Sequence, residues 1–301
     1  MHTIALIGLG RMGTPVAARL CRAGHLVRAA DLRPHRQDVA LGIGARWAAD
    51  AVTAATGADL LVTVLPGAPD VTAAVTGPVL DALAPGACWI DLSSCAPTAV
   101  AGLRTRALTR GIGVLDAPMG GSPDDAAAGR LRLFVGGPAE LLDRQRPLLS
   151  LIADRITRMG DHGAGYTTKL LVNLLWFGQA AATAEALLLG QATGIDPQAL
   201  GAALATSAAA SDFVRRDLPA LLDGDYYATY GLDRIRDQLA AVTALAERLG
   251  IPHPIADTVA ALHQQALDRF GPVDGELLAV ALLEERAGTR LGSPETARPP
   301  V

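Results

Sequence analysis

The chain contains a single lysine, Lys169, although 26 of its 301 residues are lysine or arginine. Arginine does not deprotonate in proteins, whereas lysine can act as an acid or a base, so a lone lysine in an arginine-rich chain is a candidate catalytic group. The alternative explanation is drift of the composition, since the last lysine must lie somewhere. The position of Lys169 therefore has to decide between the two.

A glycine-rich segment near the N-terminus, GLGRMG, matches the G-x-G-x-x-G pattern of dinucleotide-binding turns. It follows the first predicted strand and opens a predicted helix, which is the context that the pattern requires. The glycines permit a tight turn, the approach of a pyrophosphate and close helix packing, and the helix N-terminus offers N–H groups to phosphates. The residues that we expect to contact the cofactor here are Gly8, Gly10, Arg11, Met12 and Gly13.

The acidic residue Asp31 ends the second predicted strand, about twenty residues after this turn. A carboxylate there accepts hydrogen bonds from the adenosine ribose hydroxyls and repels a 2′-phosphate, which favours NAD as the cofactor. Arg33 lies two residues later and is a further candidate cofactor contact, because it can pair with a 2′-phosphate. NADP therefore stays open as the alternative.

Three later segments, taken together with this turn, resemble the β-hydroxyacid dehydrogenases, the group of 3-hydroxyisobutyrate dehydrogenase. They are Asp91–Pro97 (DLSSCAP), Asp116–Pro123 (DAPMGGSP) and Gly163–Lys169 (GAGYTTK) followed by Asn173. The resemblance runs from about residue 3 to 288. It implies a Rossmann domain, a long interdomain helix, an all-helical domain, and assembly into homodimers or homotetramers. It also implies hydride transfer between NAD or NADP and the hydroxyl or carbonyl carbon of a small acid.

The family's catalytic lysine, in a G-x-G-x-x-x-K pattern, matches Lys169, and its asparagine matches Asn173. Residues four apart lie on one face of a helix, so both side chains can reach one small substrate. In oxidation a neutral lysine takes the hydroxyl proton, and in reduction its ammonium returns it. A dry site lowers a lysine pKa from about 10.4 toward neutrality, where this exchange is efficient. Asn173 is expected to orient the hydroxyl or carboxyl group of the substrate.

The resemblance places two further loops at the cofactor. Ser94 occupies the position of a family threonine in the loop that approaches the nicotinamide, and Leu65 and Pro66 resemble a cofactor-contacting Leu-Pro pair. The alternative is that these residues only end their strands.

The chain also departs from the family pattern. The family reads D-A-P-x-S-G-G where this chain has Gly120, Gly121 and Ser122, so the backbone donors for a substrate carboxylate remain but the hydroxyl has moved. A second family lysine aligns with Asp237, which reverses a charge. We therefore expect a plain carboxylate to bind less well, and a neutral, zwitterionic or amine-bearing substrate to be accepted beside Asp237. The alternative is that Asp237 points to solvent or pairs with Arg234 or Arg236.

The positions of these residues depend on the secondary structure that the rest of the sequence predicts. Up to about residue 160, short apolar runs alternate with helical patterns, which predicts parallel strands in a doubly wound sheet. From about residue 162 the pattern is helical throughout. The sequence therefore predicts an α/β Rossmann domain over 1–162, joined by a long helix to an all-α substrate and oligomerisation domain over 163–290. The turn-rich residues 291–301 are expected to form a disordered tail.

Composition excludes several other classes. A net charge of −4 leaves no basic excess for nucleic acid. Three cysteines without a C-x-x-C pair argue against a disulfide framework or a metal site, and favour the cytoplasm. The apolar stretch 170–189 contains Asn173, Gln179 and Glu185, which favours a buried helix over a membrane span.

The function predicted from the sequence is thus an NAD(P)-dependent dehydrogenase or reductase acting on a small-molecule substrate. An imine reductase on the same fold is one alternative, although such enzymes usually lack the lysine. A dinucleotide-binding protein without turnover is the other, and it would not need Lys169 and Asn173.

Overall fold

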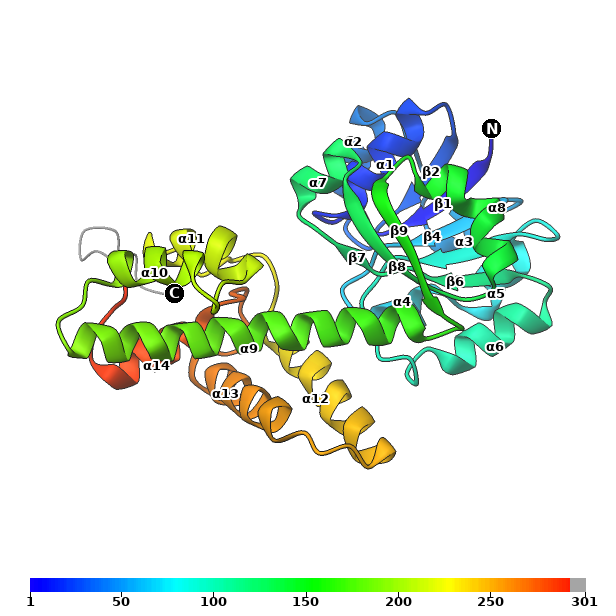
Figure 1. Cartoon of the computed structure of the whole chain (residues 1–301). Coiled ribbons are helices and arrows are strands. Elements are labelled where there is room, and N and C mark those ends of the chain that lie inside the picture. The colour runs from blue at the N-terminus through cyan, green and yellow to red at the C-terminus, as the bar shows by residue number, and fades with distance from the viewer. Residues whose placement is uncertain (293–301) are drawn as a thin grey trace. The chain divides into compact units, whose positions relative to one another are not determined.

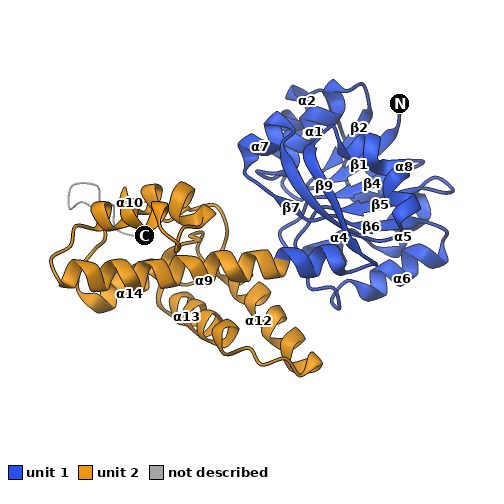
Figure 2. Ribbon diagram, viewed as in Figure 1, with its two compact units in different colours: residues 1–169 blue, residues 170–301 orange. Residues whose placement is uncertain are grey.

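A computed structural model describes residues 1–292 of the chain (Figure 1). The chain divides into two compact units, residues 1–169 and 170–301 (Figure 2). Helix α9 (Ala164–Ala192) begins in the first unit and continues into the second. The predicted architecture, a Rossmann domain followed by helices with a long helix between them, is confirmed. The predicted domain boundaries stay a prediction, and residues 293–301 of the predicted tail lie outside the described residues.

Unit 1 is built on a nine-stranded sheet in the order β3-β2-β1-β4-β5-β6-β8-β7, with β9 paired to β8. The pairs from β3 to β6 are all parallel, and this part has the strand order of a dinucleotide-binding fold. The strands are β1 (Thr3–Ile7), β2 (Leu26–Ala30), β3 (Arg46–Trp47), β4 (Leu60–Thr63), β5 (Cys88–Asp91), β6 (Gly113–Asp116), β7 (Met119–Gly120), β8 (Leu131–Gly136) and β9 (Ala153–Gly160).

One part of the sheet differs from the sequence expectation. Strand β8 runs antiparallel to β6 and β7, whereas strand–helix alternation predicts parallel pairing throughout. The reason is the connection between β6 and β8, which contains β7 and the short helix α7 (Pro123–Ala128) rather than a full crossover helix. The two-residue strands β3 and β7 were not predicted.

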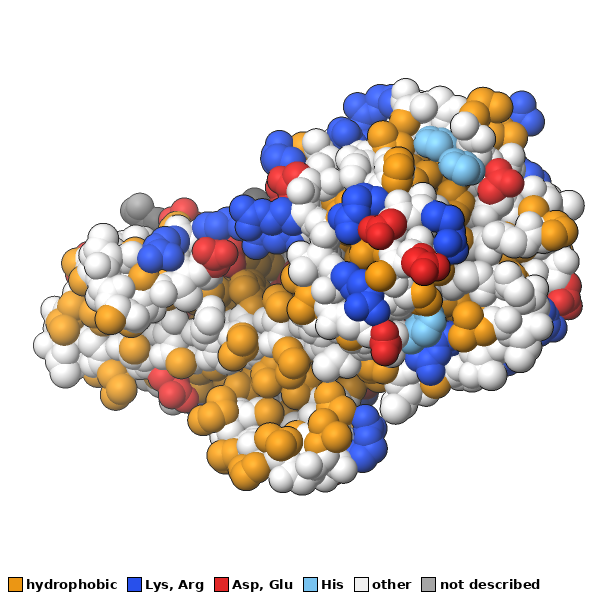
Figure 3. Space-filling model, turned by 45° about the vertical axis from the view of Figure 1, so that its right-hand side comes forward, with side chains coloured by type: hydrophobic (Ala, Val, Ile, Leu, Met, Phe, Trp, Pro, Cys, Tyr) orange, Lys and Arg blue, Asp and Glu red, His pale blue; other side chains and the backbone are white. Residues whose placement is uncertain are grey.

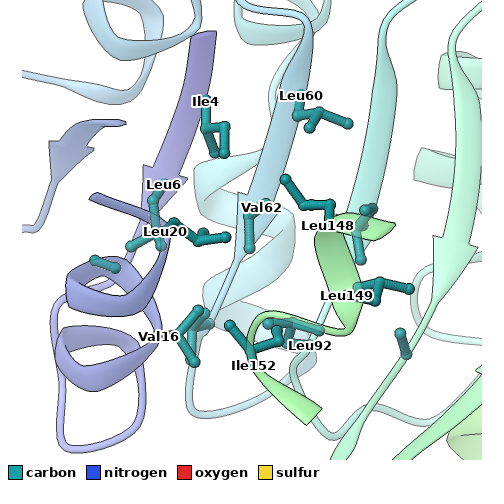
Figure 4. Packing of buried hydrophobic residues seen from close by; sticks show 14 of the residues in the cluster. Ile4, Leu6, Val16, Leu20, Leu60, Val62, Leu92, Leu148, Leu149 and Ile152 are labelled. Atoms are coloured by element: carbon teal, nitrogen blue, oxygen red, sulfur yellow. The ribbon is translucent and has the colours of Figure 1, made fainter. Parts of the chain in front are cut away.

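Helices cover both faces of the sheet (Figure 1). The helices of unit 1, besides α7 and the start of α9, are α1 (Gly13–Arg22), α2 (Arg36–Gly42), α3 (Ala51–Ala55), α4 (Ala68–Ala74), α5 (Gly77–Ala82), α6 (Ala101–Thr109) and α8 (Ala139–Leu149). Figure 4 shows one face, where side chains of β1 and β4 pack against α1 and the end of α8. The other face packs against α3, α4, α5 and α6. Burial on both faces explains why β4 is apolar almost throughout.

The described residues of unit 2 form helices, apart from one isolated antiparallel bridge between Gly231 and Asp274. The helices are the rest of α9, α10 (Pro197–Thr206), a π-helical turn η1 (Phe213–Asp217), α11 (Leu218–Leu222), α12 (Leu232–Leu249), α13 (Pro254–Phe270) and α14 (Leu278–Ala287). Helix α12 buries an apolar stripe and ends at Gly250, whose left-handed backbone terminates it. Leu291 is buried, and its N–H donates to the Glu284 carboxylate.

Helix α9 is long and apolar enough, by length and composition, to cross a membrane, but a single such helix is weak evidence. Several of its side chains pack in the cores of unit 2, among them Phe177, Ala184 and Leu187. Others are exposed, including Leu175 and Leu189. In Figure 3, hydrophobic side chains gather over the surface of the helical unit, while charged ones are more frequent on unit 1.

Candidate active site

The glycine-rich turn after β1 has the close packing that its pattern predicts. Gly8 has a φ of +102°, and a Cβ there would lie 2.3 Å from the Val64 carbonyl oxygen at the end of β4. A Cβ on Gly13 would lie 1.9 Å from the Gly8 carbonyl oxygen. A Cβ on Gly10 would meet only the end of the Arg33 side chain, at 4.0 Å. The space over Gly10 is therefore open, which fits a pyrophosphate.

Helix α1 starts at this turn, and no side chain caps it in the described chain. Its first N–H groups are thus not taken by a capping side chain, as a phosphate-binding helix requires. The turn lies at the switch point of the sheet, where β1 has β2 on one side and β4 on the other. Dinucleotides bind at such switch points, outside the carboxyl ends of the strands. The residues present therefore fit an NAD(P) cofactor.

Asp31 lies at the end of β2, and its carboxylate is already engaged. It accepts the Leu9 N–H at 2.8 Å, and the Arg33 guanidinium donates to both of its oxygens at 2.9 and 3.0 Å. Burial opposes ionisation, but the hydrogen bonds from Arg33 and Leu9 lower the pKa of Asp31. The Asp31 side chain is 7% exposed and that of Arg33 is 52% exposed. Because the Arg33 guanidinium occupies both carboxylate oxygens, a ribose hydroxyl has to share or replace these hydrogen bonds to reach Asp31.

The two loops expected at the nicotinamide are joined by a hydrogen bond. The Leu65 N–H, just after β4, donates to the Ser93 hydroxyl at 3.0 Å, just after β5. Ser94 is half-buried, and Pro66 is exposed. The structure thus brings Leu65, Pro66 and Ser94 to one edge of the sheet, with Ser93 as the residue that ties their loops together. Ser93 belongs to the DLSSCAP segment, in which the family resemblance gave a role to Ser94 only.

The N-terminus of α9 is fixed at the same edge by Asp116, the last residue of β6. Its carboxylate accepts the N–H groups of Gly163 at 2.8 Å and Tyr166 at 3.1 Å, and so acts as a helix cap supplied from another strand. A Cβ on Gly165 would lie 2.3 Å from the Phe134 carbonyl oxygen. Only glycine permits this approach, which explains the second glycine of the G-x-G-x-x-x-K pattern.

A second buried carboxylate, Asp91, also holds this first turn. It accepts the Tyr166 phenol at 2.5 Å, the Thr63 hydroxyl at 2.7 Å and the Ser93 N–H at 3.0 Å. Burial raises the pKa of Asp91, although these hydrogen bonds oppose the shift. Burial and the adjacent Asp91 carboxylate raise the pKa of the Tyr166 phenol well above its ordinary value. The sequence motifs contained both aspartates, but gave them no role.

Lys169 follows Tyr166 by three residues, so the anchored turn places it at the carboxyl edge of the sheet. Asn173 follows one helical turn later on the same side of α9. Its Nδ2 donates to the Gln238 Oε1 at 2.6 Å, and the Gln238 Nε2 donates to the Tyr230 hydroxyl at 2.7 Å. Gln238 is a buried polar residue among apolar positions of α12, and that pattern is the signal by which it could have been found.

The remaining predicted substrate contacts have other partners. Ser122 caps α7: its hydroxyl accepts the Asp125 N–H at 3.2 Å, and the Asp125 carboxylate accepts the Ser122 N–H at 3.0 Å. Gly120 lies in β7, and Gly121 is exposed with a φ of +122°. The exposed Asp237 carboxylate pairs with Arg236 at 2.8 Å, which is the alternative foreseen for it. Ser122 and Asp237 thus each have a near neighbour as partner, and their role in binding the substrate stays a prediction.

No group of three His, Cys, Asp or Glu side chains within residues 1–292 is arranged to hold a metal ion. Cys88 and Cys95 are buried. Burial raises the pKa of the Cys88 thiol to about 12, and burial with the nearby Asp91 raises that of Cys95 further. Neither thiol is suited to act as a nucleophile.

The Rossmann unit, its open glycine turn and the anchored lysine helix define an NAD(P)-dependent oxidoreductase. Two family profiles match the chain. The profile of the NAD binding domain of 6-phosphogluconate dehydrogenase matches residues 3–160. The profile of the NAD-binding region of NADP-dependent 3-hydroxyisobutyrate dehydrogenase matches residues 163–283. The chain belongs to this family of hydroxyacid dehydrogenases, and the resemblance seen in the sequence is confirmed.

Named relatives agree with this assignment. The chain is 39% identical to a 3-hydroxyisobutyrate dehydrogenase of Pseudomonas aeruginosa, over 66% of this chain and 68% of the relative. It is 38% identical to an NAD-dependent L-serine dehydrogenase of the same organism, with the same coverage. Among solved structures, Mycobacterium tuberculosis 3-hydroxyisobutyrate dehydrogenase with L-serine has a TM-score of 0.84 and 29% identity, covering 94% of this chain and 99% of that one.

The alternative enzyme class is more distant. An imine reductase from Myxococcus stipitatus has a TM-score of 0.65 at 21% identity, covering 94% of this chain and 99% of that one. This likeness shows a shared fold and nothing more about the reaction.

Proposed function

We propose that this chain oxidises the hydroxyl of a small 3-hydroxy acid, or reduces the corresponding carbonyl, with Lys169 as the general acid–base and Asn173 as the substrate-orienting amide. The observation that carries the proposal is the anchoring of α9. Asp91 and Asp116 fix the turn that precedes the only lysine, at the sheet edge where the cofactor turn lies. Drift of the composition alone would not explain why Lys169 follows a helical turn that two buried carboxylates anchor.

The mechanism assigns one task to each side chain. A bound NAD(P) supplies the hydride acceptor in oxidation and the hydride donor in reduction. In the oxidation, the neutral Lys169 amine takes the hydroxyl proton as the C–H bond breaks, and becomes an ammonium. In the reduction, the Lys169 ammonium donates that proton to the carbonyl oxygen. Asn173 holds the reacting oxygen or its neighbour on the same side of the helix, which limits the geometries that the substrate can adopt.

The substrate class follows from the relatives and from the charges at hand. 3-Hydroxyisobutyrate and L-serine are both 3-hydroxypropanoates that differ in the group on carbon 2, a methyl in one and an ammonium in the other. Asp237 was expected to favour the ammonium, but its pairing with Arg236 compensates its charge locally. We therefore propose 2-substituted 3-hydroxypropanoates as the class, with the amine accepted but not required.

The test is the variant Lys169→Arg, which keeps the positive charge and cannot deprotonate. We expect kcat to fall by roughly 10²- to 10⁴-fold, the usual effect of losing a general acid–base. Binding of NADH, followed by its fluorescence, should stay close to that of the unaltered chain. Substantial turnover by this variant with normal cofactor binding would exclude the mechanism.

We further propose that the enzyme works in the cytoplasm as a homodimer or homotetramer. The exposed leucines of α9 support assembly, because apolar side chains on a helix surface are usually covered by a partner when they lie close together. The three free cysteines agree with a reducing compartment.

A further inference from the structure

Three hydrogen-bonded side chains of unit 2 link α9 to α12. Asn173 donates to Gln238 at 2.6 Å, and Gln238 donates to the Tyr230 hydroxyl at 2.7 Å. Gln238 is 7% exposed and lies beside Ile235 and Leu239 in the buried stripe of α12. A buried amide costs free energy unless its groups are paired, and here both ends of the amide are paired. A leucine at this position could fill the same stripe, but it would leave Asn173 without its acceptor.

The pairing restricts how the Asn173 carboxamide can turn. An amide has one oxygen acceptor and two N–H donors, and Gln238 takes one of the donors. Turning Asn173 alone would bring its Oδ1 against the Gln238 Oε1, and two acceptors repel each other. The two amides can therefore turn only together, and the Tyr230 hydroxyl, which can accept or donate, is the partner of Gln238 at its far end. In the arrangement observed, Asn173 keeps its Oδ1 and one N–H for another partner.

We propose that Gln238 is a positioning residue, which acts on the substrate only through Asn173. It holds the Asn173 Oδ1 ready to accept a hydrogen bond from an ammonium on carbon 2, and leaves one Nδ2–H for the oxygen of the substrate hydroxyl, whose own proton goes to Lys169. This inference rests on the proposed function and deepens it, since it names the polarity with which the substrate is recognised. A substrate that offers a donor at this point is favoured over one that offers only an acceptor, because the acceptor would face the Asn173 oxygen.

The experiment is a double-mutant cycle between the two residues, with L-serine and 3-hydroxyisobutyrate as substrates. Gln238→Met removes the amide at nearly constant length. We expect it to raise KM by about 3- to 10-fold, the size of one hydrogen bond, with a smaller change in kcat, because the bond is present in both ground and transition states. In an Asn173→Ala background, Gln238→Met should raise KM no further, because its target is gone.

Rescue separates positioning from general support. In Gln238→Glu the carboxylate can accept from Asn173 and also from the Tyr230 hydroxyl, so we expect KM to return to within about threefold of the starting value. Gln198→Met is the matched control, because Gln198 is an exposed glutamine on α10, and it should leave KM unchanged. Thermal unfolding and NADH binding, measured for every variant, show whether each one is folded.

The outcomes are distinct. An unchanged KM in folded Gln238→Met, or an equal rise in KM with and without Asn173, would overturn the role of Gln238. If Gln238→Met does not fold, Tyr230→Phe is used instead, because it removes only the hydrogen bond between Gln238 and Tyr230. An unchanged KM in Tyr230→Phe would also overturn the role of Gln238. The proposed function fails differently: the unaltered chain would then show no NAD(P)-dependent turnover of any 3-hydroxypropanoate.

Discussion

The Tyr166 phenol donates a 2.5 Å hydrogen bond to the fully buried Asp91 carboxylate, across 75 positions of sequence. The same carboxylate accepts the N–H of Ser93, whose hydroxyl holds the loop that contains Leu65. One buried group thus connects the loops expected at the nicotinamide with the helix that carries Lys169.

We therefore expect Tyr166→Phe to lower both stability and turnover. Removing a donor from a buried carboxylate costs about 1–3 kcal/mol of the free energy of unfolding. Displacement of the α9 turn should also lower kcat, by at least about threefold and toward the 10²-fold known for small misplacements of catalytic groups. Urea unfolding and steady-state kinetics measure the two effects.

A matched control for this prediction lies in unit 2. Tyr226 donates to the buried Glu284 carboxylate at the same distance, 2.5 Å, and both residues belong to unit 2. Tyr226→Phe should lose a similar amount of stability and keep its kcat. Equal losses of kcat in the two variants would mean that the effect of Tyr166 is only one of stability.

Substitution of Ser122 tests whether this serine binds the substrate or only caps α7. Its hydroxyl caps α7, so Ser122→Ala should cost about 1 kcal/mol of stability, the usual value of an N-cap. If capping is its only task, KM for a 3-hydroxypropanoate stays within twofold. A KM that rises tenfold would instead restore the predicted role of Ser122 in binding the carboxylate.

The cysteines give a prediction that depends on pH. A raised pKa means less thiolate at a given pH, so the Cys88 and Cys95 thiols should stay unreactive toward a disulfide reagent at pH 8 in the folded protein. The half-buried Cys21 should react first as the pH rises toward 10. All three should react after unfolding in urea. Rapid labelling of Cys95 in the folded enzyme would contradict the burial on which this expectation depends.

Local patterns were sufficient for part of the fold and the site. The glycine turn and Asp31 could be found because their spacing is short, and α9 because it is long and uniform in character. The strands β3 and β7 have two residues each, too few for any periodicity to show. The antiparallel direction of β8 depends on the path of the chain between strands, which a local pattern does not record.

The side chains that anchor α9 and Asn173 could not be predicted from local patterns, for a related reason. Tyr166 meets Asp91, and Asn173 meets Gln238, across 75 and 65 positions, so the pairings themselves leave no local signal. Only Gln238, as a polar residue in the apolar stripe of α12, could have been singled out from its neighbours. The roles of Ser122 and Asp237 were inferred from alignment with a family motif. The structure shows that each has a near neighbour, Asp125 or Arg236, that already engages it.

Cofactor choice is a further prediction, and it turns on the pair of Asp31 and Arg33. We expect a higher kcat/KM with NAD than with NADP, because Asp31 repels a 2′-phosphate. Asp31→Ala frees the Arg33 guanidinium and should shift the ratio toward NADP by about tenfold, whereas Arg33→Ala should shift it toward NAD. Both cofactors are compared at one salt concentration. A tenfold advantage for NADP in the unaltered enzyme would mean that Arg33 sets the choice.

The final prediction concerns assembly. Leu175 and Leu189 on α9 are 63% and 71% exposed, and burying such side chains contributes about 25 cal/mol for each Å² removed from water. We expect light scattering at micromolar concentration to give at least twice the 30.9 kDa of one chain. Changing both leucines to glutamate should shift the mass toward that of one chain, while Leu41→Glu, at an exposed leucine of unit 1, should leave it unchanged. A single-chain mass for the fully active, unaltered enzyme would show that these leucines face water in the working protein.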